Sequence, residues 1–249
     1  MSFCDLNGKT IFISGASSGI GRQTAINISK LGAKVFITGR NEKKLEETYR
    51  ELQGDGHGKI VADLIQEDDR SSLINTLPQL DGVVHCAGIV GPTPAKFIRQ
   101  DDIKKMFGVN YRVPVLLTAG ILQKKKLNKG ASIVLMSSIV TSSPYFGGAL
   151  YSGAKGAIEA YTKTLALELV DRNIRVNCLS PGLVNTPLIT DPAKEENPEI
   201  VEDSLKRYIA KYPMGVGEAD DVANAIVFLL SEQSRWISGA NIPMGAVIR

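Results

Sequence analysis

The sequence lacks long apolar runs. None of its 249 residues lies in an apolar stretch near the roughly 18 residues that a helix needs to cross a bilayer. The first ten residues also lack the basic segment followed by an apolar segment that a secretory signal requires. We therefore expect no membrane association and a cytoplasmic location.

Cysteine is scarce and is not grouped. Cys4, Cys86 and Cys178 are far apart in the sequence, and none lies in a Cys-x-x-Cys motif. Their odd number and wide spacing argue against a disulfide framework and against a zinc site. We expect three reduced thiols and no metal site.

Neither sign of charge dominates. The 29 Lys and Arg and the 26 Asp and Glu give a net charge of +3, and the basic residues are spread along the chain. This distribution disfavours a nucleic-acid-binding role. With 43% hydrophobic and 22% charged residues, the composition is that of an ordinary globular protein. The length allows one large α/β domain or two small ones.

Two kinds of segment alternate along the chain. Short apolar segments rich in β-branched residues are followed by longer segments in which apolar residues recur at helical spacing, which is typical of βαβ units and a parallel sheet. The predicted strands are Thr10–Ser14, Val35–Thr38, Lys59–Ala62, Gly82–Cys86, Ser132–Met136, Arg175–Leu179 and Ile237–Pro243. The predicted helices are Ile20–Leu31, Glu42–Leu52, Asp101–Gln123, Tyr151–Val170 and Val222–Leu230.

Several predicted strands are apolar without interruption, as expected for parallel strands that are buried on both faces. We therefore predict a single α/β domain over residues 1–249, a Rossmann fold whose doubly wound, parallel seven-stranded sheet carries helices on both faces. Residues 186–198 are rich in proline and acidic residues, and we expect a substrate lid over about residues 186–214.

A glycine-rich turn follows the first predicted strand. Gly15, Gly19 and Gly21 separate that strand from an apolar-periodic helix. Glycine lets the backbone take positive φ and approach a pyrophosphate closely, and the N–H groups at the start of the helix attract phosphate. The spacing differs from Gly-x-Gly-x-x-Gly, and a tight turn without a ligand remains the alternative.

The end of the second predicted strand bears on the choice of dinucleotide. The chain reads Thr38-Gly39-Arg40-Asn41, without the carboxylate that accepts hydrogen bonds from a free ribose 2′-hydroxyl. Arg40 offers a planar cation suited to a 2′-phosphate, so NADP(H) is favoured over NAD(H). A solvated arginine at a strand end is the alternative. Asp63, which closes the third strand, could bond the adenine amino group or cap a helix.

Tyr151 and Lys155 are four residues apart, so on a helix they share one face. A positive charge beside a phenol favours the phenolate, which makes Tyr151 a candidate proton donor or acceptor at neutral pH. Ser138 lies 13 residues upstream of Tyr151. Together with the glycine turn, these residues indicate a nicotinamide-dependent redox enzyme.

Two further motifs are His85-Cys86-Ala87-Gly88 and Ser180-Pro181-Gly182. All these motifs, in this order, resemble the single-domain branch of the short-chain dehydrogenase/reductase family, and the resemblance runs essentially end to end. It implies that Asn110 is a fourth catalytic residue beside Ser138, Tyr151 and Lys155. The expected dinucleotide contacts are Gly15, Ser17, Ser18, Gly19, Ile20, Gly21, Arg40, Asp63, Leu64, Ala87, Gly88, Tyr151, Lys155, Pro181, Gly182, Val184 and Thr186.

The resemblance also implies a role for each catalytic residue. Tyr151 would protonate a carbonyl oxygen or deprotonate an alcohol, and Ser138 would hydrogen-bond the same oxygen. Lys155 would hold the nicotinamide ribose and favour the phenolate. Asn110 would hold open a helix turn, so that a water links Lys155 to solvent.

The sequence departs from the family pattern at two places. His85 and Cys86 stand where the family usually has two asparagines, and we expect His85 to be a buried, hydrogen-bonded histidine rather than a catalytic one. The closing segment, residues 237–246, lacks the usual Asp-Gly-Gly ending, which bears on the predicted homotetramer or homodimer.

The expected substrate is a small-molecule carbonyl compound or alcohol in a mostly apolar pocket, lined by residues 89–92, 143–146 and 188–189. Within the family, the sequence is most similar to 3-oxoacyl-[acyl-carrier-protein] reductases. Lys129 and Arg172 would then dock an acidic carrier protein, and residues 124–126 would add positive charge, although a solvated basic helix end is the favoured explanation. Sugars, ring ketones and other secondary alcohols remain alternative substrates, and a nucleotide-sensing protein without turnover is the alternative of another class.

Overall fold

The computed structural model describes residues 4–190, 209 and 212–245. Seven parallel strands form one sheet in the order β3-β2-β1-β4-β5-β6-β9. The strands are β1 (Thr10–Ser14), β2 (Lys34–Gly39), β3 (Gly58–Val61), β4 (Leu80–His85), β5 (Leu127–Met136), β6 (Arg175–Pro181) and β9 (Asn241–Met244). The predicted single-domain, seven-stranded Rossmann fold is confirmed.

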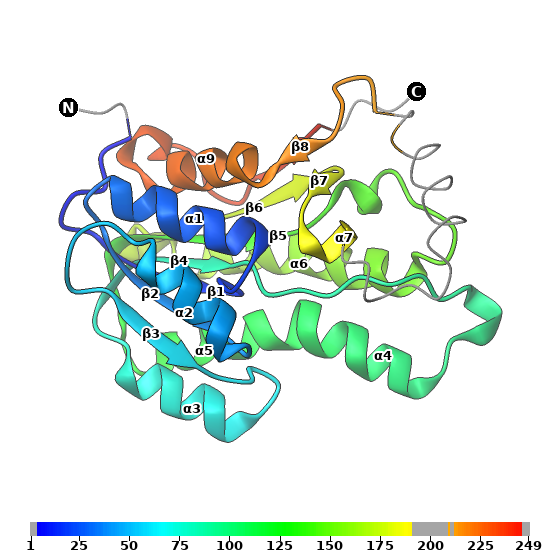
Figure 1. Ribbon diagram of the computed structural model, residues 1–249, viewed down its shortest axis with the longest axis horizontal. Helices are drawn as coiled ribbons and strands as arrows, with labels where there is room; N and C mark the ends of the chain where they lie inside the picture. Colours follow the sequence, from blue (N-terminus) through cyan, green and yellow to red (C-terminus); the bar gives the residue numbers. More distant parts are fainter. Residues whose placement is uncertain (1–3, 191–208, 210–211, 246–249) are drawn as a thin grey trace.

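Helices connect these strands. They are α1 (Gly19–Lys30), α2 (Glu42–Arg50), α3 (Glu67–Thr76), α4 (Gln100–Phe107), α5 (Val113–Gln123), α6 (Ala149–Glu168), α7 (Pro187–Thr190) and α9 (Ala219–Leu230). Figure 1 shows the sheet with α1 and α9 above it and α3 and α4 below it. Two short strands, β7 (Val184–Asn185) and β8 (Gly217–Glu218), pair separately from the main sheet. No helix of the described residues is long and apolar enough to span a membrane.

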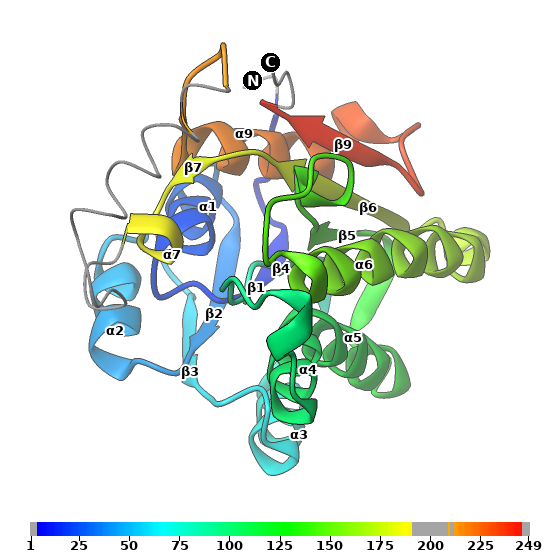
Figure 2. The same ribbon diagram turned by 90° about the vertical axis from the view of Figure 1, so that its right-hand side faces the viewer.

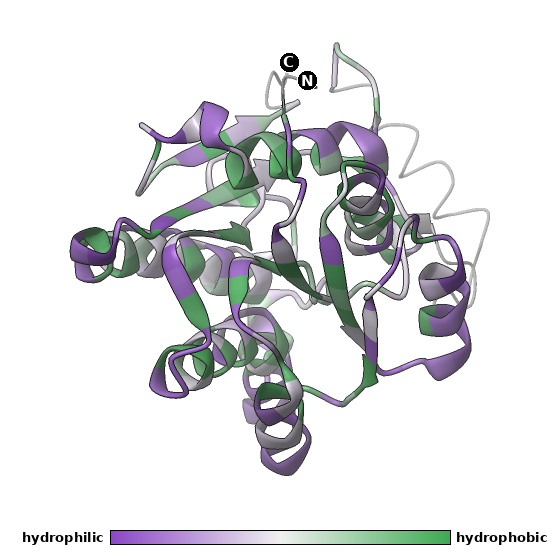
Figure 3. Cartoon of the chain, turned by 90° about the vertical axis from the view of Figure 1, so that its left-hand side faces the viewer, coloured by the Kyte–Doolittle hydropathy of each residue, from purple (hydrophilic) through white to green (hydrophobic). Residues whose placement is uncertain are grey.

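The side chains of β1 alternate between two cores. Phe12 packs with residues of α3, α5 and α6 on one face of the sheet, whereas Ile11 and Ile13 pack with residues of α1, α2 and α9 on the other. Figure 2 shows α1 and α9 on one side of the sheet and α5 and α6 on the opposite side. Hydrophobic colour is concentrated along the strands between them in Figure 3. Burial on both faces explains the uninterrupted apolar strands.

The chain reverses its direction of travel across the sheet between β1 and β4. Strands β2 and β3 extend the sheet on one side of β1, and β4, β5, β6 and β9 extend it on the other. In a doubly wound sheet, the crevice outside the carboxyl ends of the strands at such a reversal is the place where ligands bind. The loops after β1 and β4 carry the glycine turn and the His85–Gly88 motif.

The long helix predicted over residues 101–123 is not a continuous α-helix. It divides into α4, a π-helical segment Gly108–Arg112, and α5. Pro114 at the start of α5 has no backbone N–H to donate, and the Asn110 side chain bonds the Met106 carbonyl oxygen at 3.1 Å. The widened turn is therefore centred on the predicted catalytic asparagine.

Among the other differences from the prediction are two strand boundaries and one missed helix. The closing strand begins at Asn241 rather than Ile237, because the chain turns through Gly239, whose φ is +75°. β5 begins at Leu127, before the predicted strand. α3 was missed because its only buried apolar residues are Leu73 and Ile74, which leave little helical periodicity to read. The predicted lid lies mostly in residues 191–208 and 210–211, outside the described residues.

Candidate active site

The glycine turn packs directly against the loop after β4. Gly15 has a φ of +72°, and a Cβ placed on it would lie 2.5 Å from Ala87 N. A Cβ on Gly21 would lie 2.4 Å from Gly15 O. No larger residue fits at either position without moving backbone, because real Cβ atoms do not approach other atoms this closely. These two glycines let the carboxyl ends of β1 and β4 meet.

The N-terminus of α1 opens from this turn. Its N-cap residue, Ser18, is extended and makes no side-chain capping hydrogen bond. The first N–H groups of a helix have no partner within the helix, and with the helix dipole they attract an anion. The backbone at residues 19–21 is therefore suited to a pyrophosphate.

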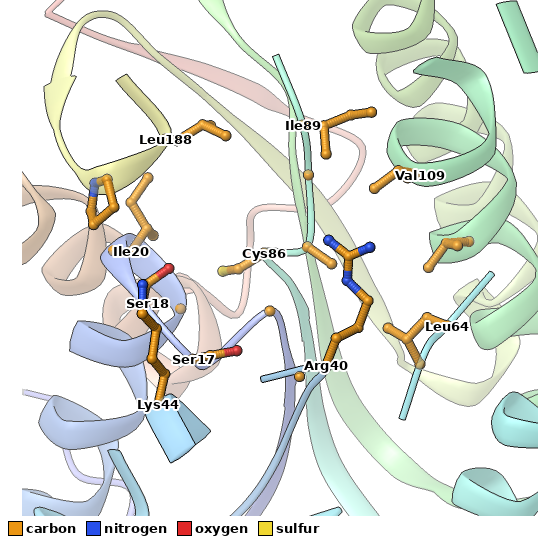
Figure 4. Close-up of a pocket in the computed structure, with 18 of the residues that line it drawn as sticks. Ser17, Ser18, Ile20, Arg40, Lys44, Leu64, Cys86, Ile89, Val109 and Leu188 are labelled. Atoms are coloured by element: carbon orange, nitrogen blue, oxygen red, sulfur yellow. The ribbon is translucent and has the colours of Figure 1, made fainter. Parts of the chain in front are cut away.

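A cavity of about 600 Å³ lies over this turn, within the range of small-molecule and cofactor sites. Figure 4 shows side chains that line it, with those of Arg40 and Lys44 extending toward it. Twelve of the residues predicted from the sequence as dinucleotide contacts line it: Gly15, Ser17, Ser18, Gly19, Ile20, Gly21, Arg40, Asp63, Leu64, Ala87, Gly88 and Thr186. The glycine cradle, the uncapped helix end and the two cations fit a dinucleotide bearing phosphates.

Sequence reasoning missed some of the residues around this cavity. Lys44 lies in the first turn of α2, four residues after Arg40, and its position beside the second strand end is the signal that could have found it. Cys86 follows β4, and Lys105 and Val109 come from α4 and the π-helical segment. The last two are brought in by tertiary packing, for which no local pattern exists.

Five other predicted dinucleotide residues, Tyr151, Lys155, Pro181, Gly182 and Val184, are not part of this lining.

Gly88 connects the cavity to two of the predicted catalytic residues. A Cβ on Gly88 would lie 3.1 Å from Asn110 Oδ1 and 3.8 Å from Lys155 Nζ. The cavity therefore ends beside the predicted catalytic lysine and asparagine.

Lys155 is buried in the middle of α6, with 5% of its surface exposed. Its Nζ donates a hydrogen bond to Met136 O at 2.8 Å and lies 5.6 Å from the centre of the Tyr151 ring. Burial lowers the pKa of Lys155 to about 8. The predicted i, i+4 pair therefore shares one face of α6, with the ammonium group beneath the phenol ring.

Asn110 is also buried, and its amide holds the loop after β4. The Oδ1 atom accepts a hydrogen bond from Ile89 N at 3.2 Å, and Nδ2 donates to Ile89 O at 3.0 Å. Nδ2 also lies 3.1 Å from Met106 O. One side chain thus joins the widened helix turn to the cavity loop.

Ser138 follows the end of β5 and caps a short 3₁₀ helix, Ile139–Thr141. Its Oγ accepts a hydrogen bond from Val140 N at 3.3 Å and donates a long one to Pro181 O at 3.5 Å. The predicted catalytic serine therefore lies beside the Ser180-Pro181-Gly182 motif at the end of β6.

The structure refines the expectations for Asp63 and His85. Asp63 does not cap a helix: Gln66 is the N-cap of α3, and Asp63 Oδ1 instead accepts from Ile65 N. His85 is buried as expected but only half hydrogen-bonded, since Nε2 bonds Thr118 Oγ1 at 2.9 Å and Nδ1 has no partner among the described residues. Burial lowers its pKa to about 3, so the ring is neutral at physiological pH.

The predicted substrate pocket is only partly formed by the residues expected to line it. Ile89 and Leu188 line the described cavity, whereas Phe146 is 86% exposed.

The three cysteines are free thiols, as expected. Burial raises the pKa of Cys86 to about 12, so this thiol beside the cavity stays protonated at neutral pH.

The sheet topology and the cavity at the strand reversal define a Rossmann-fold protein. A family model described as Enoyl-(Acyl carrier protein) reductase matches residues 15–245. The 3-oxoacyl-[acyl-carrier-protein] reductase of Rickettsia felis is 35% identical over 239 residues, 96% of this chain and 95% of the relative. The glucose 1-dehydrogenase of Gluconobacter oxydans is 33% identical over 94% of this chain and 90% of the relative.

A comparison with solved structures points to the same family. A short-chain type dehydrogenase/reductase from Mycobacterium ulcerans superimposes with a TM-score of 0.84 at 27% identity, covering 97% of this chain and 90% of that one. The chain belongs to the short-chain dehydrogenase/reductase family. It is an oxidoreductase that uses a nicotinamide cofactor and acts on CH–OH or carbonyl groups.

Gly21→Ala should damage the cradle. The new Cβ would meet Gly15 O at 2.4 Å, so we expect NADPH affinity to fall about tenfold or more. The matched control is Gly156→Ala on α6, where a Cβ meets nothing within 4 Å and helix propensity gains about 1 kcal/mol. Titration of nucleotide fluorescence measures both, and equal affinity in the two variants would contradict the cradle.

Lys155 should make stability depend on pH between about 8 and 10.5. Its pKa is about 8 in the fold and 10.5 in the unfolded chain, so the unfolded state binds more protons in this window. The destabilisation is fully present below pH 8 and disappears as pH rises to 10.5, with an upper limit of about 3 kcal/mol.

The difference in unfolding free energy between the wild-type protein and Lys155→Met measures this effect without cofactor. Methionine has a similar length and no charge, so the other titrating groups cancel in the difference. We expect the variant's relative advantage to shrink as pH rises across the window. A difference that stays constant from pH 8 to 10.5 would contradict the buried charge.

Proposed function

We propose that this protein is an NADP(H)-dependent ketoreductase, with 3-oxoacyl thioesters as the first substrate class to test. The observation that carries the proposal is the position of Lys155 Nζ. It lies below the Tyr151 ring and beside Gly88, where the cavity ends. An acid/base pair at the end of a dinucleotide cavity is the arrangement that carbonyl reduction needs.

The nicotinamide, when bound, supplies the hydride. Tyr151 Oη then donates a proton to the carbonyl oxygen as negative charge develops there, or takes one from an alcohol in the reverse direction. Ser138 Oγ hydrogen-bonds the same oxygen and fixes its orientation. The charge of Lys155 favours the phenolate form of Tyr151 and binds ribose hydroxyls.

Asn110 contributes to the return of a proton to Tyr151, because its side chain holds the π-helical turn in place. Its amide bonds both backbone groups of Ile89, which fixes the loop beside Lys155. A π-helical turn leaves backbone carbonyls available to a water molecule. We propose that such a water returns a proton to Lys155 and so to Tyr151.

Two cations support the preference for NADP(H). Arg40 and Lys44 both line the cavity near the carboxyl end of β2, and Gly39 and Asn41 beside Arg40 carry no negative charge. An arginine binds a phosphate with two parallel hydrogen bonds, and a lysine adds a second positive charge. A free 2′-hydroxyl has no carboxylate to bond at this strand end.

The second candidate is a dehydrogenase or reductase of a sugar, ring ketone or other secondary alcohol. It would use the same catalytic residues, and the glucose 1-dehydrogenase relative is what favours it. The 3-oxoacyl-[acyl-carrier-protein] reductase of Rickettsia felis shows slightly higher identity, 35% against 33%. We therefore place the thioesters first.

Docking of an acyl carrier protein stays a prediction. Lys129 is exposed, but Arg172 donates a hydrogen bond to Leu127 O and Lys126 bonds Leu77 O. All of them lie at the amino end of β5, whereas Ser138 follows its carboxyl end. The strand between spans about 30 Å at 3.3 Å a residue, so a carrier docked there would lie far from the site of the same chain.

We also propose a homodimer or homotetramer assembled through α5 and α6. Leu167 on α6 is 75% exposed, and two further large apolar residues, Leu116 on α5 and Val170 in the turn after α6, are also exposed. A monomer that leaves such residues in water gains by covering them against a second copy.

Tyr151→Phe should separate binding from chemistry. It removes the proton donor and keeps the ring, so we expect kcat to fall by about 10² to 10⁴ while NADPH affinity stays unchanged. The matched control is Tyr161→Phe, on the same helix, next to Tyr111 rather than the site. Near-normal turnover in Tyr151→Phe would remove this residue from the mechanism.

Arg40→Ser should change the choice of cofactor. Without the guanidinium we expect the KM for NADPH to rise about tenfold or more, and the KM for NADH to change little, because only NADPH carries the 2′-phosphate. Arg50→Ser, at the other end of α2 in an ion pair with Glu46, is the control. An equal loss for both nucleotides would exclude Arg40 from 2′-phosphate recognition.

A further inference from the structure

The carboxylate of Glu159 lies beside three hydroxyl groups from two separate segments. Its Oε1 lies 2.8 Å from Ser137 Oγ, 2.8 Å from Thr141 Oγ1 and 3.4 Å from Ser180 Oγ. Glu159 is on α6, one helical turn after Lys155, so both side chains lie on the same face of the helix. None of the roles proposed above uses this residue.

The two short contacts lie on either side of the catalytic serine. Ser137 immediately precedes Ser138, and Thr141 ends the 3₁₀ helix that Ser138 caps. Ser137 Oγ also lies 3.2 Å from Lys155 O, and Ser137 N donates to Leu179 O at 2.7 Å. The backbone around Ser138 is thus tied to α6 before and after the serine.

Proton counting favours the carboxylate as the acceptor. Each hydroxyl has one proton to donate, and an ionised carboxylate oxygen accepts several donors. Thr141 Oγ1 lies closer to Glu159 Oε1, at 2.8 Å, than to Ser138 O, at 3.1 Å. Hydrogen bonds to an ionised acceptor are the stronger kind, so Ser137 and Thr141 direct their protons to Glu159.

The third contact extends the network to the sheet edge. Ser180 Oγ donates its single proton to Asn241 Oδ1 at 2.7 Å, so Ser180 lies near Glu159 without donating to it. Ser180 precedes Pro181, whose carbonyl oxygen accepts from Ser138. The carboxylate therefore lies where the ends of β5 and β6 meet the helix that carries Tyr151 and Lys155.

We propose that Glu159 is a positioning residue, which fixes the Ser138 segment against α6 and so sets Ser138 in register with Tyr151. The inference rests on the proposed function, because it presumes that both residues act on one oxygen. Displacement of a reacting group by about 1 Å can cost about a hundredfold in rate. Glu159 itself touches neither substrate nor cofactor in this account.

The first test compares two substitutions of Glu159. Glu159→Gln keeps an acceptor oxygen at the same place, whereas Glu159→Leu removes it at similar size. We expect Leu to lower kcat about tenfold or more with the KM for NADPH within about threefold, and Gln to recover most of kcat. Glu168→Leu, an exposed glutamate on the same helix, is the control and should change neither constant.

Hydrogen exchange provides a reading that needs no substrate and no cofactor. In Glu159→Leu, the amides of residues 137–143 should exchange faster than in the wild-type protein, while those of β1 and α1 stay protected. If Glu159→Leu does not fold, Thr141→Val removes one of the two short contacts and should show the same change in exchange with a smaller loss of kcat.

Three results would overturn the proposal. They are unchanged exchange over residues 137–143, a Gln variant as impaired as the Leu variant, or a kcat loss that only parallels a global loss of stability. Failure of the proposed function looks different, since the wild-type protein would then bind NADPH without turnover while the exchange result stands.

Discussion

Burial of the Lys155 ammonium group is the constraint around which the site is arranged. A cation with 5% of its surface exposed loses most of its hydration, and its pKa falls to about 8 as a consequence. The fold compensates with the Met136 carbonyl oxygen and the face of the Tyr151 ring. The same loss of hydration strengthens every interaction that this charge makes, which is what a lysine needs in order to hold a phenolate and ribose hydroxyls.

The elements around Lys155 keep its ammonium group within reach of a ligand in the cavity. Gly88 has no side chain to block the cavity from the ammonium group, and Asn110 holds the loop that contains it. On the other side of the cavity, Gly15 and Gly21 let the glycine turn pack closely against the loop after β4, where the dinucleotide is expected to bind. Glu159, on the same face of α6 as Lys155, ties the serine segment to this helix.

Much of this arrangement could be predicted from the sequence because its signals are local. The i, i+4 spacing of Tyr151 and Lys155, the strand–glycine–helix order around Gly15 and the lack of an acidic residue beside Arg40 are each visible in a few consecutive residues. The fold class followed from the alternation of apolar strands and periodic helices, and the comparisons confirm both the fold and the family.

The rest depends on contacts between distant segments. The π-helical turn within residues 101–123 contains Asn110, whose side chain bonds Ile89, 21 residues away in sequence. The contacts of Glu159 with Ser137 and Ser180 span 22 and 21 residues. The hydrogen bond of His85 Nε2 is made with Thr118 on α5, 33 residues away in sequence. A local sequence pattern does not show which distant residues come into contact. The partners of Glu159 and His85 therefore could not be predicted from the sequence.

The proposed ketoreductase activity is tested most directly by NADPH oxidation, followed by absorbance, across 3-oxoacyl thioesters, 2-enoyl thioesters, simple ketones, ring ketones and keto-sugars. NADH should be assayed in parallel. We expect oxidation with a ketone-bearing class, faster with NADPH than with NADH, and none with the enoyl thioesters. Tight NADPH binding without oxidation by any member, and without reduction of NADP by the matching alcohols, would contradict the proposed activity and indicate a nucleotide-sensing protein.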